Sequence, residues 1–331
     1  MKLAKRIEAL QKLKDWLSEE SEELESAMKE AYENNKWFTK EFLKHRIKSI
    51  VDQYLDEEKL DLWIRHYHLD ENIESKKVGI IMAGNIPLVG FHDFLCVFIT
   101  GHHAYLKLSD KDKVMFKKLV DKLICFDQDI ANLVTISEML KECNAYIATG
   151  SNNTSRYFEY YFGKYPSVIR KNKTSVAVLT GGESEEELKS LADDVFLYFG
   201  LGCRNVTQLF VPKDYDFVPL LNAFKKYDSL KDHVKFKNNY DYHLAILIMN
   251  DRKYMCNDCL VLVEGDHLFS PVSELYYTYY NSIDELENKL MKEESIQCVV
   301  GKGHIEFGRA QETGLFDYAD GVDTMQFLLS I

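Results

Sequence analysis

The segment most suited to covalent chemistry is Phe199–Pro212, which reads FGLGCRNVTQLFVP. Cys203 follows a Gly-x-Gly helix breaker and precedes an apolar run typical of a strand. Glycines allow a substrate to approach the backbone closely, and main-chain N–H groups can then face an oxyanion. A thiolate here would be far more nucleophilic than a hydroxyl, and Arg204 beside it favours the thiolate. The pattern predicts a cysteine nucleophile, with a buried core cysteine beside a turn as the alternative.

Three other polar clusters follow apolar, β-branched runs that are typical of strands, at 78–82, 104–108 and 146–148. A helical pattern separates each of these runs from the next. Strands that alternate with helices indicate a parallel α/β sheet, and ligands bind in the loops at the carboxyl ends of such strands. The polar or small residues that follow the runs are Ala83, Gly84, Asn85, Ser109, Asp110, Thr149, Gly150 and Ser151.

The remaining pattern predicts two or three helices before residue 75, where apolar residues recur at helical spacing without Gly or Pro. Ser184 with Glu187 forms a capping box that opens a helix ending before Gly200. The other helices are expected at 89–99, 111–126 and 283–290. Strands are expected at 133–136, 175–179, 208–211, 244–249, 260–263 and 276–280, and at Thr324–Ile331, which is expected to pair across a dimer.

Size and composition indicate a globular chain of about two domains. It has 331 residues, 46% of them hydrophobic, with no signal-peptide core and no apolar run long enough to span a membrane. We therefore expect a cytoplasmic protein. A net charge of −12 disfavours nucleic acid and anionic membranes, although the Lys-rich stretch 107–122 is a candidate pocket for an anionic cofactor. The expected domains are residues 1–172, residues 173–310 and a C-terminal segment, 311–331, that returns to the first domain or a dimer interface.

The seven cysteines are odd in number and lie mostly in apolar segments, as expected of reduced thiols in a cytosolic protein. Cys256-x-x-Cys259 is the nearest approach to a metal motif. It lacks a second pair and a close histidine, so two core cysteines are the better interpretation and no metal is expected.

Taken together and in order, these motifs resemble those of the aldehyde dehydrogenase superfamily over roughly residues 75 to 275. The nucleophile segment resembles that superfamily's cysteine motif, and IIMAGNIPL at 80–88 resembles its Pro-Trp-Asn-Phe-Pro motif. GHHAYLKLSD at 101–110 and ATGSN at 148–152 are similar to two of its cofactor motifs. HLFSPV at 267–272 is similar to its Glu-x-Phe-Gly-Pro-Val motif.

The resemblance implies an α/β fold with a Rossmann-type cofactor domain, an α/β catalytic domain and added N-terminal helices. It implies that Cys203 is the nucleophile and that Asn85 donates a hydrogen bond to the oxyanion. The implied nicotinamide contacts are Ala83, Gly84, Lys107 at the ribose, Ser109, Asp110, Thr149, Gly150, Ser151 and His267, which replaces the Glu of the last motif.

One departure from the superfamily's motifs narrows the resemblance to a single branch of that superfamily. Hydrolytic aldehyde dehydrogenases carry a Glu that activates water, and Ile169 stands in its place here. The pattern, including Val168-Ile169-Arg170, resembles the acyl-CoA reductase branch typified by the fatty-acid reductase of bacterial luminescence. That likeness implies reduction of a long-chain fatty acyl-CoA to its aldehyde with NADPH, or alternatively NADH, through a thioester on Cys203, with CoA as leaving group.

Other interpretations remain open. The chain could act on a short acyl-CoA or an acyl phosphate. It could be a partner-dependent acyl-carrying subunit, served by an acyl-protein synthetase or acyl-carrier partner, or a plain α/β binding protein. Asn85 could be a turn residue, Lys107 a solvated lysine, and 149–151 an ordinary helix N-cap. A homodimer is expected, as in the superfamily.

Overall fold

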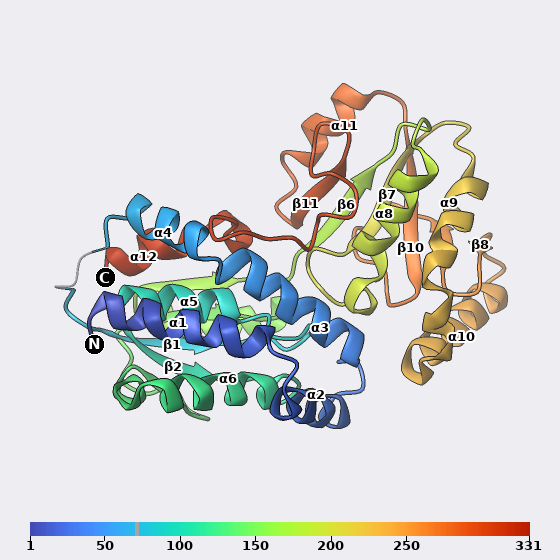
Figure 1. Ribbon diagram of the computed structural model, residues 1–331. Helices are drawn as coiled ribbons and strands as arrows, with labels where there is room; N and C mark the ends of the chain where they lie inside the picture. The colour runs from blue at the N-terminus through green and yellow to red at the C-terminus, as the bar shows by residue number, and fades with distance from the viewer. Residues whose placement is uncertain (70–72) are drawn as a thin grey trace. The chain divides into compact units, whose positions relative to one another are not determined.

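The computed structural model describes residues 1–69 and 73–331 (Figure 1). The chain divides into two compact units. Unit 1 combines Met1–Asn172 with Thr313–Ile331, and unit 2 is the continuous segment Lys173–Glu312. Each unit contains its own, largely parallel β-sheet, which confirms the mixed α/β class that the alternating pattern predicts.

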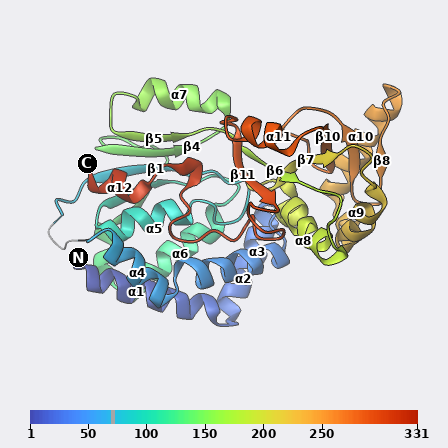
Figure 2. The same ribbon diagram turned by 90° about the horizontal axis from the view of Figure 1, so that it is seen from above.

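Unit 1 is built on a five-stranded, fully parallel sheet in the order β3-β2-β1-β4-β5. Figure 2 shows helix α7 on one side of this sheet and helices α5 and α6 on the other. Every residue of α5 is buried, because it lies between the sheet and the N-terminal helices. The bounds are β1 Lys77–Ile81, β2 His103–Lys107, β3 Val134–Ile136, β4 Ala145–Thr149, β5 Ser167–Arg170, α5 Phe91–Thr100, α6 Lys113–Phe126 and α7 Asn152–Phe162.

The N-terminal region forms four α-helices within the described residues, where the pattern predicts two or three. They are α1 Leu3–Ser18, α2 Glu22–Asn34, α3 Lys40–Ser49 and α4 Glu57–His66, with a π-helical turn at Ile50–Tyr54. Ser21, Thr39 and Asp56 cap the last three, each accepting from a main-chain N–H three residues on. The apolar stripes of these helices share one core with α5 and α6.

The C-terminal segment returns to unit 1 as a helix, α12 (Thr324–Leu329), so the strand expected at 324–331 is wrong. Asp323 starts the helix by accepting from the Gln326 N–H at 2.8 Å. Met325 and Leu328, one turn apart, are fully buried against α5. The spacing of three is helical, and it decides the structure over the apolar composition of the segment. The segment therefore offers no strand that could pair across a dimer.

Unit 2 carries a six-stranded sheet in the order β11-β6-β7-β10-β9-β8, in which only the edge pair β8–β9 is antiparallel. The capping box at Ser184 and Glu187 is confirmed at the start of α8. The bounds are β6 Thr174–Val178, β7 Val206–Pro212, β8 Met255–Cys256, β9 Val261–Glu264, β10 Glu274–Tyr280, β11 Ile296–Gly301, α8 Glu185–Phe196, α9 Phe217–Ala223, α10 Val234–Met249 and α11 Ile283–Leu290.

Residues 244–249, expected to be a strand, are the last turns of α10. His233 caps this helix, with its ring nitrogen accepting from the Phe236 N–H at 3.3 Å. No Gly or Pro interrupts the sequence from Val234 to Met249, so the helix continues through the apolar run. Leu247 is buried, while Met249 stays exposed.

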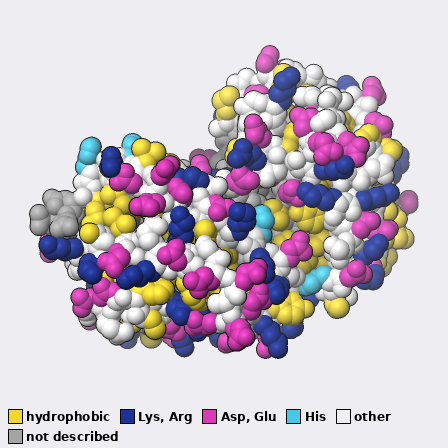
Figure 3. Space-filling model, viewed as in Figure 1, with side chains coloured by type: hydrophobic (Ala, Val, Ile, Leu, Met, Phe, Trp, Pro, Cys, Tyr) yellow, Lys and Arg dark blue, Asp and Glu magenta, His cyan; other side chains and the backbone are white. Residues whose placement is uncertain are grey.

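The surface carries charges of both signs. Figure 3 shows acidic and basic side chains interspersed over the face in view, rather than a single basic field. None of the helices in the part of the chain that the structure describes is long and apolar enough to cross a membrane.

Candidate active site

The predicted cofactor residues of unit 1 converge on one edge of its sheet. Ala83, Gly84 and Asn85 follow β1, and Lys107, Ser109 and Asp110 end or follow β2. Thr149, Gly150 and Ser151 end or follow β4. All these strands are parallel, so their carboxyl ends meet at the same edge. From β1 the next strands along the chain, β2 and β3, lie on one side, whereas β4 and β5 lie on the other. Doubly wound sheets bind ligands at such a switch point, here between β1 and β4.

The Asn85 loop is held by buried charges on both sides. Arg46 donates to the carbonyl of Leu88 at 3.4 Å, and the Asp112 carboxylate accepts from the N–H groups of Leu88 and Val89. Burial raises the pKa of Asp112 above its ordinary range, an effect that these N–H groups and Arg46 oppose. Leu88 has a left-handed backbone, φ 51°, so the loop keeps a conformation that its surroundings must maintain.

Gly84 lies so close to the next loop that a side chain does not fit. A Cβ atom added to it would lie 2.3 Å from Ser109 Oγ. Lys107 and Asp110 beside it are exposed, and the Asp110 carboxylate pairs loosely with Lys113 at 3.4 Å. This edge therefore offers a tight main-chain approach together with exposed charges of both signs.

Helix α7 presents its N-terminus at the same edge. Ser151 caps it, accepting from the Thr154 N–H at 3.3 Å, so the helix-cap interpretation of 149–151 is correct in geometry. A cap does not exclude a ligand, because a helix N-terminus also attracts phosphate groups. Gly150 stands within close contact distance of the Thr154 and Phe158 side chains, leaving no room for a larger residue.

Strand β5 carries the position at which a hydrolytic enzyme would have its glutamate. Ile169 is half-buried there. Its neighbour Arg170 is buried and forms an ion pair with Asp93 at 2.5 Å, and its guanidinium also donates to Thr324 Oγ1 at 2.9 Å. The Asp93 carboxylate is thus paired with the buried Arg170 guanidinium.

In unit 2, the chain between α8 and β7 contains Cys203, and we call it the nucleophile turn. It begins with a sharp reversal of the chain. Helix α8 ends at Phe196, and Tyr198, Phe199 and Gly200 then adopt left-handed backbones in succession, with φ 55°, 58° and 72°. Left-handed conformations cost non-glycine residues about 1–2 kcal/mol each. Tyr198 and Phe199 are held in place by burial, since their exposed fractions are 3% and 2%.

Cys203 follows this reversal and is half-buried, immediately before β7. Its main-chain carbonyl accepts from Ser175 Oγ at 3.0 Å, and the same hydroxyl lies 3.1 Å from Cys298 Sγ. Burial raises the pKa of Cys298. The turn thus rests on the amino end of β6 beside a second, protonated thiol.

A buried carboxyl ties the turn region to the segment that leaves unit 2. Asp194 has no exposed surface, and its oxygens accept from the N–H groups of Gly308 and Ala310 at 2.6 and 2.9 Å. Arg204 donates to the carbonyl of Ala310 at 3.1 Å. Burial raises the pKa of Asp194 to about 7, against the effect of the two N–H groups.

His267 is exposed in the loop that follows β9, also in unit 2. Two residues of β7 fasten this loop: Thr207 donates to the carbonyl of Leu268, and Gln208 donates to that of Gly265 at 3.1 Å. A small cavity of about 20 Å³ is lined by Gly200 and Thr207 of the nucleophile motif together with residues 270–272. The motif at 267–272 thus lies against the nucleophile motif at 199–212.

Sequence reasoning assigned no role to four buried polar residues around these motifs: Asp112, Ser175, Asp194 and Asn205. A usable signal existed for Asp194, which is a charged residue in line with the buried positions Leu191 and Val195 of α8. Ser175 is the second residue of β6 and precedes its apolar residues, which is a weaker signal.

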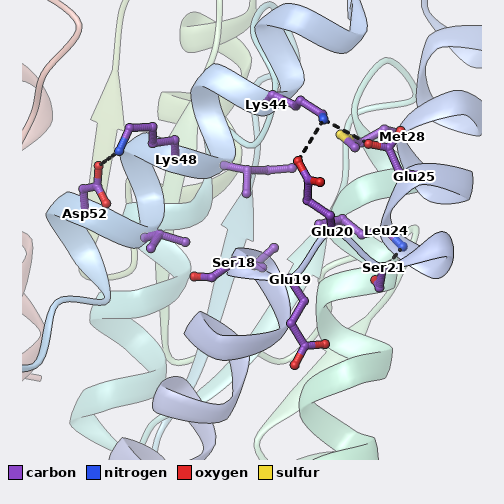
Figure 4. A pocket seen from close by; sticks show the side chains of 13 residues that line it. Ser18, Glu19, Glu20, Ser21, Leu24, Glu25, Met28, Lys44, Lys48 and Asp52 are labelled. Atoms are coloured by element: carbon purple, nitrogen blue, oxygen red, sulfur yellow. Dashed lines mark hydrogen bonds and ion pairs between the residues drawn. The ribbon is translucent and has the colours of Figure 1, made fainter.

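The hollows among the N-terminal helices contain none of these residues. One of about 380 Å³ opens among α1, α2 and α3, with an apolar floor that includes Leu24 and Met28 (Figure 4). Lys44 crosses it toward Glu25 at 3.1 Å. It contains none of the predicted site residues, so we leave it out of the site.

Cys259 is buried, with its sulfur 3.4 Å from Asn257 Oδ1, whereas Cys256 is exposed. Residues 1–69 and 73–331 contain no group of three or more His, Cys, Asp or Glu placed to hold a metal ion.

Comparison with known proteins gives a family and a fold. A family profile described as acyl-CoA reductase (LuxC) matches residues 2–220, about two thirds of the chain. Among curated protein sequences, none matches. Solved structures that resemble the chain include a mutant aldehyde dehydrogenase from Bacillus cereus, with TM-score 0.68 and 12% identity over 91% of this chain and 72% of that one.

Two further structures agree. Aldehyde dehydrogenase 21 from Physcomitrella patens has TM-score 0.66 and 11% identity over 91% of this chain and 74% of that one. HpcC from Thermus thermophilus has TM-score 0.68 and 11% identity over 91% and 70%. The aldehyde-dehydrogenase-like fold expected from the motifs is confirmed.

Proposed function

Because the chain belongs to the acyl-CoA reductase (LuxC) family, and is thus an oxidoreductase, we propose that it reduces a long-chain fatty acyl-CoA to the aldehyde through a thioester on Cys203. The observation that carries the proposal is the nucleophile turn, in which Cys203 is half-buried between a chain reversal and β7. Both Cys203 and Asn85 lie within the matched residues 2–220.

The proposed reaction begins with attack of the Cys203 thiolate on the thioester carbonyl. The Asn85 amide and the Cys203 main-chain N–H stabilise the oxyanion, a type of contact worth about 10²–10³ in rate for each donor. Collapse breaks the carbon–sulfur bond to CoA, which leaves as a thiolate and takes up a proton. The acyl group then remains on Cys203 as a thioester.

The absence of the usual base supports reduction rather than hydrolysis. Ile169 cannot activate water, and the Asp93 carboxylate is occupied by Arg170. An acyl group on Cys203 therefore has a longer lifetime against water. Exchange with a thiol needs no such base, because thiols ionise near pH 8.5.

The edge of the unit 1 sheet fits a nicotinamide cofactor. Gly84 admits a close main-chain approach, and the N-terminus of α7 suits a phosphate. We assign Ala83, Gly84, Lys107, Ser109, Asp110, Thr149, Gly150 and Ser151 to its binding, with His267 from unit 2. When bound, the reduced cofactor supplies the hydride that converts the acyl group to an aldehyde.

We propose NADPH as the cofactor and NADH as the alternative. Lys107, Lys111 and Lys113 attract a 2′-phosphate, while Asp110 repels it. The Lys113 ammonium lies 3.4 Å from the Asp110 carboxylate and offsets part of that repulsion.

The test is intact-protein mass spectrometry after mixing with palmitoyl-CoA, followed by NADPH or NADH. Wild type should gain one acyl group and lose it as aldehyde when the cofactor is added. Cys203→Ala should gain none, while Cys125→Ala, which removes an exposed thiol of unit 1, should behave as wild type.

Other outcomes select the alternatives. An adduct that both cofactors leave in place favours an acyl-carrying subunit served by an acyl-protein synthetase or carrier. An adduct only with a short acyl-CoA or an acyl phosphate changes the substrate class. No adduct with any acyl donor removes Cys203 as nucleophile.

A further inference from the structure

Asn205 lies two residues after Cys203 and has no exposed surface. Its main-chain N–H donates to the Gly202 carbonyl at 3.1 Å, and its carbonyl accepts from the Ser175 N–H at 3.2 Å. Its side-chain oxygen accepts from the Gly202 N–H at 2.8 Å. Its side-chain NH₂ donates to the carbonyls of Asp194 and Leu197 at 3.0 and 2.9 Å. Asn205 thus joins the end of α8, the turn and strand β6.

The two carbonyls at the end of α8 explain why this residue is a carboxamide. A helix leaves its last carbonyls without intrahelical partners, and here the chain reverses at once through Tyr198 and Phe199. The Asn205 NH₂ donates to the carbonyl of Asp194 in the last turn and to that of Leu197 just after the helix, while its oxygen accepts from the Gly202 N–H. An apolar side chain would leave buried groups unpaired, and a carboxylate would face the carbonyls with oxygen.

The same bonds fix the peptide groups on both sides of Cys203. A peptide unit is planar and trans, so the Gly202 carbonyl and the Cys203 N–H lie in one plane and point in opposite directions. Holding the Gly202 carbonyl through Asn205 therefore sets the direction of the Cys203 N–H. The next peptide plane is held by Ser175 Oγ at the Cys203 carbonyl, 3.0 Å away.

We propose that Asn205 is a positioning residue, which aims the Cys203 sulfur and main-chain N–H at the acyl carbonyl by clamping the turn to the end of α8. This inference rests on the proposed function, in which that N–H stabilises the oxyanion. Asn205 itself touches neither substrate nor cofactor. Loss of Asn205 should therefore slow the attack of Cys203 on a carbonyl more than it slows alkylation of the same thiol.

The experiment compares two reagents on the full chain. p-Nitrophenyl acetate acylates a thiol through an oxyanion, whereas iodoacetamide alkylates it without one. Rates at Cys203 are followed by peptide mass mapping, with the exposed Cys125 as internal reference. The variant is Asn205→Asp, which has nearly the same shape and keeps the acceptor but loses the donor.

The matched control is Leu286→Ala. Leu286 is a buried residue of α11 that packs with Val176 and Phe210, so its truncation destabilises unit 2 without touching the turn. Should Asn205→Asp fail to accumulate as folded protein, Asn205→Ser is measured with the same reagents and the same criterion.

We expect Asn205→Asp to lower acylation of Cys203 by about 10²-fold, as misplacement by about 1 Å does, and alkylation by less than about threefold. Leu286→Ala should keep the wild-type ratio of the two rates. Equal losses in both rates, or unchanged acylation, would show that Asn205 only stabilises the fold.

Failure of the proposed function is recognised separately. A wild-type Cys203 that accepts acetyl from the ester but no acyl group from palmitoyl-CoA contradicts the thioester substrate, and the ester assay still decides the role of Asn205. If neither the ester nor palmitoyl-CoA acylates Cys203, the proposed function and the role of Asn205 are both overturned.

Discussion

Asn85 and Cys203 act differently in the proposed reaction, and substitution separates them. Asn85→Ala removes an oxyanion donor but leaves the thiol, so the single-turnover rate of acylation by palmitoyl-CoA should fall by about 10²–10³. Iodoacetamide alkylation of Cys203 should keep its wild-type rate. If Asn85 is only a turn residue, Asn85→Ala will lower stability and leave the acylation rate of the folded protein intact.

Asp194 makes the stability of unit 2 depend on pH. Its pKa in the folded chain, about 7, is above the ordinary value of 3.8, so the folded state holds this proton more tightly than the unfolded state. The stability linked to this proton is complete below about pH 3.8 and is lost as pH rises through about 7. Asp194→Asn removes the titration.

We therefore compare wild type with Asp194→Asn by urea unfolding. The difference in the free energy of unfolding, wild type minus variant, should fall by about 2 kcal/mol between about pH 5 and about pH 8. Other titrating groups are the same in both chains and cancel. A difference that stays flat or rises with pH would contradict the raised pKa.

At the scale of elements, the buried pair Asp93–Arg170 joins α5 to β5, and Arg170 reaches Thr324 of α12. Arg170→Met leaves the Asp93 carboxylate buried without its cation, which should cost about 3–5 kcal/mol of the free energy of unfolding. Adding Asp93→Leu removes the uncompensated charge, so the double variant should recover most of that loss in urea unfolding. A double variant no more stable than the single one would contradict this account.

The same elements show how far sequence reasoning reaches. Strands β1, β2 and β4 and the polar residues at their ends were predictable, because β-branched runs ending in Gly, Asn or Ser are local signals. Local signals failed at α12 and at the end of α10. Ile246 and Ile248 alternate with Leu as in a strand, but only the uninterrupted chain from Val234 shows that the helix continues.

The candidate site divides in a similar way. The two motifs that contain Asn85 and Cys203 could be read from the sequence, because the residue types and their order carry the chemistry. The buried supports of the two loops could not. Asp112 bonds to Leu88 and Val89, and Asn205 to Asp194 and Leu197, and these are contacts between separate elements that spacing alone does not reveal.

At the scale of the whole molecule, unit 1 is discontinuous and depends on its C-terminal segment. His92 bonds to the Leu315 carbonyl at 3.0 Å, and burial lowers the pKa of His92 to about 4. His102 bonds to the Leu328 carbonyl at 2.9 Å. A fragment of Met1–Asn172 lacks these partners and exposes the apolar face of α5. We expect it to unfold at a lower temperature than the same fragment joined through a flexible Gly/Ser linker to Thr313–Ile331, as followed by circular dichroism.

Unit 2 is continuous and has its own core, so Lys173–Glu312 should unfold cooperatively when produced alone. It retains Cys203 with Ser175, Asp194 and Asn205, so iodoacetamide should alkylate Cys203 at close to the rate of the full chain. It lacks Asn85, and acylation by palmitoyl-CoA should fall at least as far as in Asn85→Ala. A fragment that is acylated as fast as the full chain would mean that unit 1 supplies no oxyanion donor, and the role of Asn85 would have to be abandoned while that of Cys203 stood.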